Sequence, residues 1–286
     1  MSCLQQSETF YPYPLNIMSF RLFFGVALLS VGALTCSHAT LLIQENFDYT
    51  PDQPLGGQAG GTGWSGAWSG STPSITVVNP TLGYGDLITD GGHVRLSANT
   101  DTVRSLARPY GGSGTDIWIS FLIDAGGAGQ GVSLLLGDRE LAFFGTPSGV
   151  PTGHYGALFP FAGQQAIDLR GSISASGANL MVIRMNQTGR APIFKAWLNP
   201  DLESLRKGVE PARATGAGGI VGAEFTYLTF NAIRLARIGG PSDAQIDELR
   251  IATHPGALVD IPELATGAMV MGAMGALLVL TRRRRV

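Results

Sequence analysis

Cysteine is almost absent from this sequence, since the 286 residues include only Cys3 and Cys36. Both precede Ala39, the residue after which we predict that a leader is cleaved, so we expect the mature chain to hold no thiol. Such a chain has no disulfide, no cysteine-ligated metal and no cysteine nucleophile. Its stability must therefore come from a packed core.

Charged residues are also scarce, at 14% of the chain against roughly 25% in average globular proteins. Residues 40–261 contain 14 Lys and Arg against 19 Asp and Glu, a net charge of −5, whereas the last five residues carry +4. A nucleic-acid-binding protein needs a clustered basic face to neutralise phosphates. Because the body of the chain is mildly acidic, we exclude nucleic acid as a partner.

Long segments with helical periodicity are missing, and glycine is abundant, with 40 residues. The body consists instead of short alternating or apolar runs separated by Gly, Pro, Asn and Asp, and these predict strands at 41–47, 75–78, 93–98, 116–123, 132–136, 140–145, 180–185, 193–198, 225–230 and 245–251. Without crossover helices, these strands predict one all-β domain over 40–258, a sandwich of two antiparallel sheets. Within this body, the only helix predicted is a single turn at Asp201–Lys207.

Residues 1–39 have the parts of a secretory leader. Arg21 supplies a positive charge, 22–34 form an apolar segment, and Ser37-His38-Ala39 places small residues at −3 and −1. We predict cleavage after Ala39 and a true start at Met18, because 1–17 carry no Lys or Arg. An N-terminal membrane anchor is the alternative, but the thirteen residues 22–34 span only about 20 Å as a helix, less than the ~30 Å hydrocarbon core.

The end of the chain predicts one transmembrane helix. Residues 264–280 form a 17-residue run without a charge, about 25 Å long as a helix. The cluster Arg282, Arg283, Arg284 and Arg285 follows, and it would stop translocation and stay cytoplasmic. A buried core helix is the alternative, but such a helix is not normally apolar all round and next to four consecutive charges.

The whole C-terminal segment, residues 259–286, resembles the sorting signal of PEP-CTERM proteins: a Pro-Glu-Pro motif, a membrane helix and a basic cluster. Pro262 and Glu263 match the motif, while Leu264 stands where the second Pro would be. The resemblance implies transient residence in the inner membrane and removal of the tail by an exosortase-type enzyme. The protein would then reach the cell surface or extracellular matrix of a Gram-negative bacterium, and a permanently anchored protein is the alternative.

Several short stretches of the body resemble LamG-like, concanavalin A-like jelly rolls. They are Glu45-Asn46-Phe47-Asp48-Tyr49, Gly63-Trp64-Ser65-Gly66-Ala67-Trp68, Trp118-Ile119-Ser120-Phe121, Ala196-Trp197-Leu198-Asn199-Pro200 and Ile246-Asp247-Glu248-Leu249-Arg250-Ile251. The resemblance implies two packed antiparallel sheets whose first and last strands are neighbours. Members of this family bind glycans, bind proteins, cleave glycans or have no known ligand.

Aromatic residues in loops are the candidate glycan contacts. Trp64 and Trp68, with Tyr155 in a second loop, could stack on the apolar faces of sugar rings. The alternative is that both Trp rings fill the end of the sandwich beneath their loop. Trp118 and Trp197, in apolar strands, are expected in the core.

Paired carboxylates are the candidate catalytic groups, because a glycosidase needs two of them about 5–9.5 Å apart. Only Asp138 with Glu140 and Asp201 with Glu203 have the spacing that places both on one face of a strand. Both pairs lie at turn signals, where solvated carboxylates are the ordinary finding. The Glu-x-Asp-x-x-Glu motif of concanavalin A-like glucanases is absent from the sequence.

Calcium is the one metal ion that the sequence suggests, and no other cofactor is predicted. Asp48 and Asp247 would lie close together if the first and last strands are neighbours, and carboxylate oxygens suit this ion. Hydrogen bonding of these carboxylates to loop backbone is the alternative. The isolated residues His93, His154 and His254 have no partner at zinc-ligand spacing.

These observations favour a non-enzymatic, exported protein of the cell surface or extracellular matrix that binds, or is embedded in, exopolysaccharide. Two alternatives stay open. A glycan hydrolase or lyase on the same fold would have converging carboxylates in a cleft. A purely structural matrix protein would have neither a groove nor exposed aromatic rings.

Overall fold

The computed structural model describes residues 40–259, except 71–72, 152, 161–165, 173–176, 190–191, 213–215, 220–226 and 240–241. The predicted leader, the Pro-Glu motif, the 264–280 helix and the arginine cluster lie outside the described residues. Within the described part, no helix is long and apolar enough to cross a bilayer.

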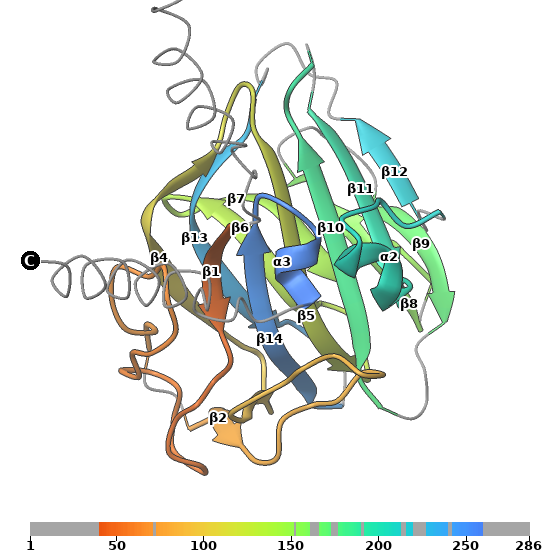
Figure 1. Cartoon of the computed structure of the whole chain (residues 1–286). Helices are drawn as coiled ribbons and strands as arrows, with labels where there is room; N and C mark the ends of the chain where they lie inside the picture. The colour runs from red at the N-terminus through yellow and green to blue at the C-terminus, as the bar shows by residue number, and fades with distance from the viewer. Residues whose placement is uncertain are drawn as a thin grey trace, which may run out of the picture. The chain divides into compact units, whose positions relative to one another are not determined.

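Two antiparallel sheets make up the body, as predicted (Figure 1). The eight-stranded sheet has the order β12-β11-β10-β5-β14-β3-β2, with β1 also paired to β14, and the six-stranded sheet has the order β4-β13-β6-β7-β8-β9. The strands are β1 Leu41–Glu45, β2 Ile75–Val78, β3 His93–Leu96, β4 Thr100–Gly111, β5 Asp116–Ala125, β6 Gln130–Leu136, β7 Arg139–Gly145, β8 His154–Leu158, β9 Ile167–Ser172, β10 Asn179–Asn186, β11 Ile193–Leu198, β12 Gly216–Gly219, β13 Thr229–Arg237 and β14 Ala244–Ala252.

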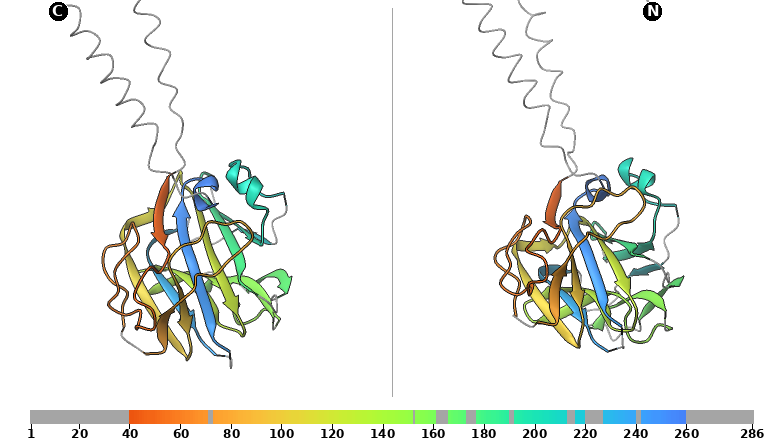
Figure 2. Two further views of the ribbon diagram at one scale, coloured as in Figure 1. Left: turned by 60° about the horizontal axis from the view of Figure 1, so that its bottom comes forward. Right: turned by 90° about the horizontal axis from the view of Figure 1, so that it is seen from below.

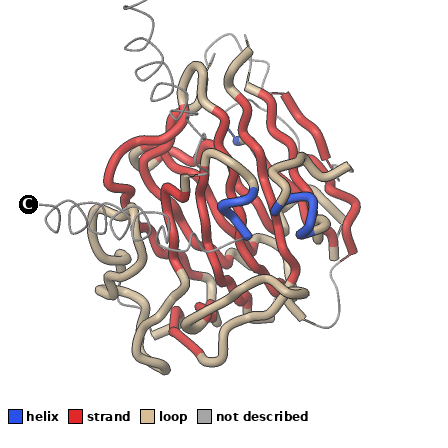
Figure 3. The backbone as a smooth tube through the Cα atoms, in the orientation of Figure 1, coloured by secondary structure: helices blue, strands red, loops and turns tan. Residues whose placement is uncertain are grey.

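Two short helices, α2 (Leu202–Arg206) and α3 (Gly256–Val259), lie together over the eight-stranded sheet (Figures 1 and 3). They explain why β5 is almost continuously apolar. Its residues Ile119 and Phe121 belong to the core between the sheets, whereas Trp118 and Leu122 belong to a second apolar cluster with residues of both helices. A strand buried on both faces loses the usual alternation of polar and apolar residues. The predicted burial of Trp118 and Trp197 is confirmed.

The first and last strands are neighbours, as the family resemblance implied. Strand β1 pairs with β14 from Leu41 opposite Ala252 to Glu45 opposite Leu249. Just beyond them, the Thr40 amide donates to Thr253 Oγ1 at 3.3 Å, and the Thr253 amide donates to the Thr40 carbonyl at 3.0 Å. The two ends of the described body therefore meet at one place.

The glycine-rich segment 60–69 links the two sheets at one side of the sandwich, where the long loop between β1 and β2 runs (Figure 2). Thr62 bridges to Gln44 beside β1, and Trp64 bridges to Leu106 in β4. Gly63 has φ +84°, and a Cβ there would lie 2.3 Å from the Leu42 carbonyl oxygen. Glycine is required at this position because the two backbones approach closely and φ is positive.

Sequence patterns missed several strands and misplaced one. No strand was predicted at β4, β8, β9 or β12, and no helix at α3. Strand β4 was missed because it turns Thr102 and Arg104 inward, where they are buried, so its inner face does not read as apolar. The predicted strand 225–230 was wrong in position, since β13 begins at Thr229 and runs to Arg237.

Candidate functional site

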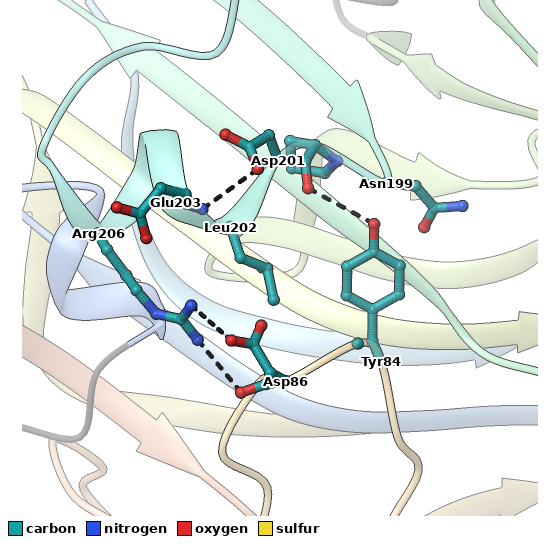
Figure 4. A pocket seen from close by; sticks show the side chains of 9 residues that line it. Tyr84, Asp86, Asn199, Asp201, Leu202, Glu203 and Arg206 are labelled. Carbon is teal, nitrogen blue, oxygen red and sulfur yellow. Dashed lines mark hydrogen bonds and ion pairs between the residues drawn. The ribbon is translucent and has the colours of Figure 1, made fainter.

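A groove of about 680 Å³ opens between α2 and the loop 79–92, which connects β2 to β3 over the outer face of the eight-stranded sheet (Figure 4). Its volume falls within the range of small-ligand sites. The residues that line it are Tyr84, Gly85, Asp86, Asn199, Pro200, Asp201, Leu202, Glu203 and Arg206.

The α2 wall is fixed by its own caps and by the sheet beneath it. Asp201 accepts hydrogen bonds from the amides of Glu203 at 3.4 Å and Ser204 at 2.9 Å, so it caps the helix at the start of the predicted helical turn. Leu205 is fully buried in the outer apolar cluster and holds the helix down. Because these contacts set the helix position, Glu203 and Arg206 project from a fixed backbone.

The turn before α2 is attached to strand β10. Asn199 has φ +52°, and its side chain accepts from the Leu180 amide at 2.9 Å and donates to Asn179 Oδ1 at 2.8 Å. An Asn tolerates this left-handed conformation better than most residues. The Asn199-Pro200 pair is therefore a rigid corner at one end of the groove.

The opposite wall comes from the loop and is joined to α2 at two points (Figure 4). The Tyr84 hydroxyl donates to the Pro200 carbonyl at 3.5 Å. Arg206 donates to the Asp86 carboxylate at 2.7 Å and to the Asp86 carbonyl at 3.2 Å. Leu202, which is nearly buried, lies between these bridges and forms an apolar floor beside the Tyr84 ring.

Two groove carboxylates are held in the charged form. Hydrogen bonding from the Arg206 guanidinium lowers the pKa of Asp86, and hydrogen bonding from the Ser204 hydroxyl and amide lowers the pKa of Asp201. Burial and the nearby Asp201 charge raise the pKa of Tyr84, which keeps its phenol protonated. The groove thus combines an aromatic ring, a phenolic hydroxyl and ionised acceptors.

The loop that carries Tyr84 and Asp86 is fastened to β14 by buried charged residues. Asp247 Oδ2 accepts from Thr81 Oγ1 at 2.6 Å and from the Leu82 amide at 2.8 Å. Burial raises the pKa of Asp247 to about 8. These contacts fix the start of the loop, two residues before Tyr84.

The far end of the loop is fastened by the next residues of β14. Glu248, at φ +49° in an irregularity of the strand, accepts from the Asp90 amide at 2.7 Å, and burial raises its pKa. Arg250 donates to Glu248 at 2.6 Å, to the Ile88 carbonyl at 2.7 Å and to the Leu258 carbonyl at 2.7 Å. One irregular strand segment therefore holds both the groove loop and α3.

The calcium prediction is not supported by this geometry. Asp247 is buried and accepts protein hydrogen bonds on both oxygens, including one from the Glu248 amide at 2.7 Å, whereas Asp48 is exposed. Among the described residues, no three His, Cys, Asp or Glu side chains gather in a way that could hold a metal ion. The backbone hydrogen-bonding alternative describes Asp247 correctly.

The predicted aromatic stacking platform is wrong for two of its three members. Trp68 is 2% exposed and Tyr155 is fully buried, so neither ring can present a face to a sugar. Trp64 is partly buried, packs against the core, and donates from Nε1 to the Gln44 carbonyl at 3.1 Å. The two Trp rings pack into the sandwich beneath their loop, as the alternative stated, because their apolar area gains more from burial than from exposure. Tyr155 lies in strand β8, not in a loop as predicted, and its ring belongs to the core.

The sequence landmarks around Trp68 form a buried polar cluster. The carboxylate of Glu45 pairs with Arg104 and accepts from Trp68 Nε1 at 3.2 Å and from the Tyr49 hydroxyl at 2.9 Å. The Arg104 guanidinium also lies 4.8 Å from the centre of the Trp64 ring. Burial raises the pKa of both Glu45 and Tyr49. These residues are structural, and they join β1, the glycine-rich segment and β4.

Neither predicted carboxylate pair has the surroundings of a catalytic pair. Glu140 binds Ser133 Oγ at 2.6 Å and pairs with Arg234, while Asp138 stands exposed in the turn between β6 and β7. Asp201 caps α2, and Glu203 pairs with Lys207 at 3.1 Å. Of the four, only Asp201 and Glu203 line the groove.

Tyr84, Asp86 and Arg206 were not identified from the sequence. Asp86 and Arg206, which share a hydrogen bond, are 120 residues apart in the sequence. The segment around Tyr84 and Asp86 has the sequence of an ordinary polar loop, and Arg206 lies in the one-turn helix. The available signal was the isolated Tyr84 between two glycines, Gly83 and Gly85.

Comparison with known proteins identifies no family. No family model matches the sequence, and no curated protein matches it. Among solved structures, the globular domain of T. cruzi calreticulin is similar with a TM-score of 0.46 and 11% identity, covering 85% of this chain and 100% of that domain. Domain 4 of AbnA, a GH43 extracellular arabinanase from Geobacillus stearothermophilus solved with arabinotriose, gives 0.40 and 14%, covering 78% and 99%.

A third similar structure is the potassium-bound carbohydrate recognition domain of Emp46p, with a TM-score of 0.37 and 10% identity, covering 64% of this chain and 87% of that one. Likenesses this distant carry no conclusion about activity. What the chain's own geometry defines is a two-sheet antiparallel β-sandwich with a polar groove and one aromatic ring on the outer face of the larger sheet.

Proposed function

We propose that this protein is a glycan-binding, non-enzymatic component of the bacterial cell surface or extracellular matrix, with a LamG-like body that binds exopolysaccharide in the α2 groove. The observation that carries the proposal is the groove itself, where the Tyr84 ring lies beside an apolar floor and within a rim of carboxylates and a guanidinium. Sugar rings have an apolar face and a hydroxyl edge, so an aromatic ring flanked by fixed polar groups suits them.

Binding is favoured over hydrolysis because of the tasks that the groove carboxylates already have. A glycosidase needs one carboxylic acid that keeps its proton near neutral pH. Asp86 and Asp201 have lowered pKa values instead, and each accepts hydrogen bonds that stabilise the charged form. Both are therefore suited to accept hydrogen bonds from sugar hydroxyls rather than to donate a proton.

A glycan array with the full-length protein tests this role. We expect binding to at least one bacterial polysaccharide or oligosaccharide, and we expect Tyr84→Ala to lose about tenfold or more of the affinity, the value of one aromatic stacking contact of about 1.5 kcal/mol. Tyr227→Ala is the matched control, because Tyr227 is an exposed tyrosine outside the groove. Silence across the array, or equal losses in both variants, would refute the proposal.

The cellular localisation of the protein is a separate part of the proposal, and it rests on the sequence. The leader with its cleavage after Ala39, the Pro262-Glu263 motif and the arginine cluster after an apolar run support export and exosortase-type sorting. Cell fractionation with intact-mass measurement tests it. We expect the surface form to begin at Thr40 and to lack everything after about Glu263, whereas retention of Arg282–Arg285 would show a permanently anchored protein.

A further inference from the structure

The charges of the groove are strongly unequal. Asp86, Asp201 and Glu203 line it against one cation, Arg206. Arg206 already makes two contacts with Asp86, one to the carboxylate and one to the backbone carbonyl. The guanidinium is thus turned toward the loop. The lining residues have a net charge of −2, which the adjacent Lys207, paired with Glu203, reduces to −1 around the remaining two carboxylates.

The two remaining carboxylates both project from the start of α2. Asp201 is exposed, and hydrogen bonds from α2 hold its carboxylate in place. Its charge reaches Tyr84, whose pKa it helps to raise, so the carboxylate acts on the same part of the groove as the ring. Glu203 is exposed on the first turn of α2 and adds a second carboxylate. Lys207 Nζ lies 3.1 Å from Glu203 Oε1, but both side chains are exposed to solvent, so this ion pair is weak.

An aromatic face and carboxylates attract the same kind of ligand group. A ring attracts a cation placed over its face, and ionised carboxylates form charge-assisted hydrogen bonds with an ammonium group. A uronate or sulfate group would be repelled by the net negative charge, and the Arg206 guanidinium that could bind it is already hydrogen-bonded to Asp86. We propose that the groove selects a glycan that carries free amino groups, such as a chain of glucosamine residues, over acetylated and acidic glycans; this inference rests on the proposed glycan-binding function.

Three oligosaccharides of equal length test the selection. Binding of the full-length protein to glucosamine, N-acetylglucosamine and galacturonate oligomers is measured by calorimetry at low ionic strength and again at higher salt. We expect the glucosamine oligomer to bind more tightly than the N-acetylglucosamine oligomer, by about two- to fivefold for each exposed carboxylate that an amino group contacts. This difference in affinity should decrease as the salt concentration increases. We expect the galacturonate oligomer to bind most weakly.

Charge-removing variants separate this inference from the proposed function. Glu203→Gln and Asp201→Asn should each lower the affinity for the amino oligomer about two- to fivefold more than the affinity for the acetylated oligomer, so that the preference for the amino form shrinks. Asn is a good helix cap, and Glu203 has no capping role, so at least the Glu203 variant leaves α2 intact. Asp138→Asn, an exposed turn carboxylate on the other sheet, is the control.

The outcomes are distinct. Equal binding of amino and acetylated oligomers, or a preference for galacturonate, overturns the selection and leaves glycan binding in place. Binding of none of the three overturns the selection as well, and the array then decides whether another glycan binds. A preference for the amino form that Glu203→Gln and Asp138→Asn weaken equally would show general attraction to an acidic protein rather than recognition in the groove.

Discussion

Asp247 should make the protein less stable as the pH rises. Burial raises the pKa of this residue from 3.8 to about 8 in the folded protein. A carboxyl whose pKa is raised by folding binds its proton more tightly in the folded state than in the unfolded state. The stability that this group contributes is therefore complete below pH 4 and is lost progressively as the pH rises toward 8.

The slope of this effect follows from linkage. One proton held in the folded state and released in the unfolded state changes the free energy of unfolding by about 1.4 kcal/mol per pH unit, or about 3 kcal/mol between pH 5 and pH 7. The local geometry accommodates the proton. Protonated Asp247 can donate to the Thr81 hydroxyl, which in turn donates to the Leu82 carbonyl 3.3 Å away. Glu45 and Glu248, whose pKa values are also raised, act in the same direction.

Urea unfolding at several pH values, with Asp247→Asn as the comparison, isolates the contribution of this residue. The variant cannot titrate, and its amide nitrogen cannot accept from the Leu82 amide as Asp247 Oδ2 does. We expect it to be less stable than the natural protein at pH 5 by about 1–3 kcal/mol, with the difference shrinking as the pH rises. Parallel curves for the two proteins from pH 5 to pH 8 would refute the reasoning.

Three further changes test other parts of the structure. Glu45→Ala should lower the free energy of unfolding by about 3–5 kcal/mol, because it leaves the buried Arg104 guanidinium without its carboxylate; urea denaturation measures this, and a loss below 1 kcal/mol would contradict the buried pair. Gly63→Ala should cost more than about 1 kcal/mol through its positive φ and its contact with the Leu42 carbonyl, whereas Gly66→Ala, which has open space, should be nearly neutral in a thermal melt. Leu205→Ala should cost about 2–5 kcal/mol as a buried truncation and should also weaken glycan binding, since this side chain anchors α2; unchanged affinity would show that the helix position does not matter.

The sandwich could be predicted from the sequence because its strongest signals are local. Runs such as 116–123 and 180–185 are apolar, short and bounded by turn residues, and they became β5 and β10. Asp201 was recognisable as the start of a helical turn because capping depends on a residue and its next three neighbours. The edge of the six-stranded sheet was not recognisable, since β4 pairs its inward Arg104 with a glutamate 59 residues earlier.

The groove could not be predicted because it depends on contacts between distant residues. Tyr84 and Arg206 make their contacts across the groove with a loop that β14 holds in place through Asp247 and Arg250. The position of the Trp rings could not be settled from the sequence for a related reason. A tryptophan in a glycine-rich loop has the same local sequence whether its ring faces solvent or, like Trp68, reaches a buried carboxylate 23 residues away.

The position of the groove has a mechanical consequence. Arg206 lines the groove, and its carbonyl oxygen lies 3.3 Å from where a Cβ on Gly256 of α3 would be. Arg250 joins the groove loop to the last turn of the same helix through the Ile88 and Leu258 carbonyls. A force on any ligand held in the proposed groove would therefore be passed from α2 and the loop to α3 and the end of β14, which are the last described elements of the chain.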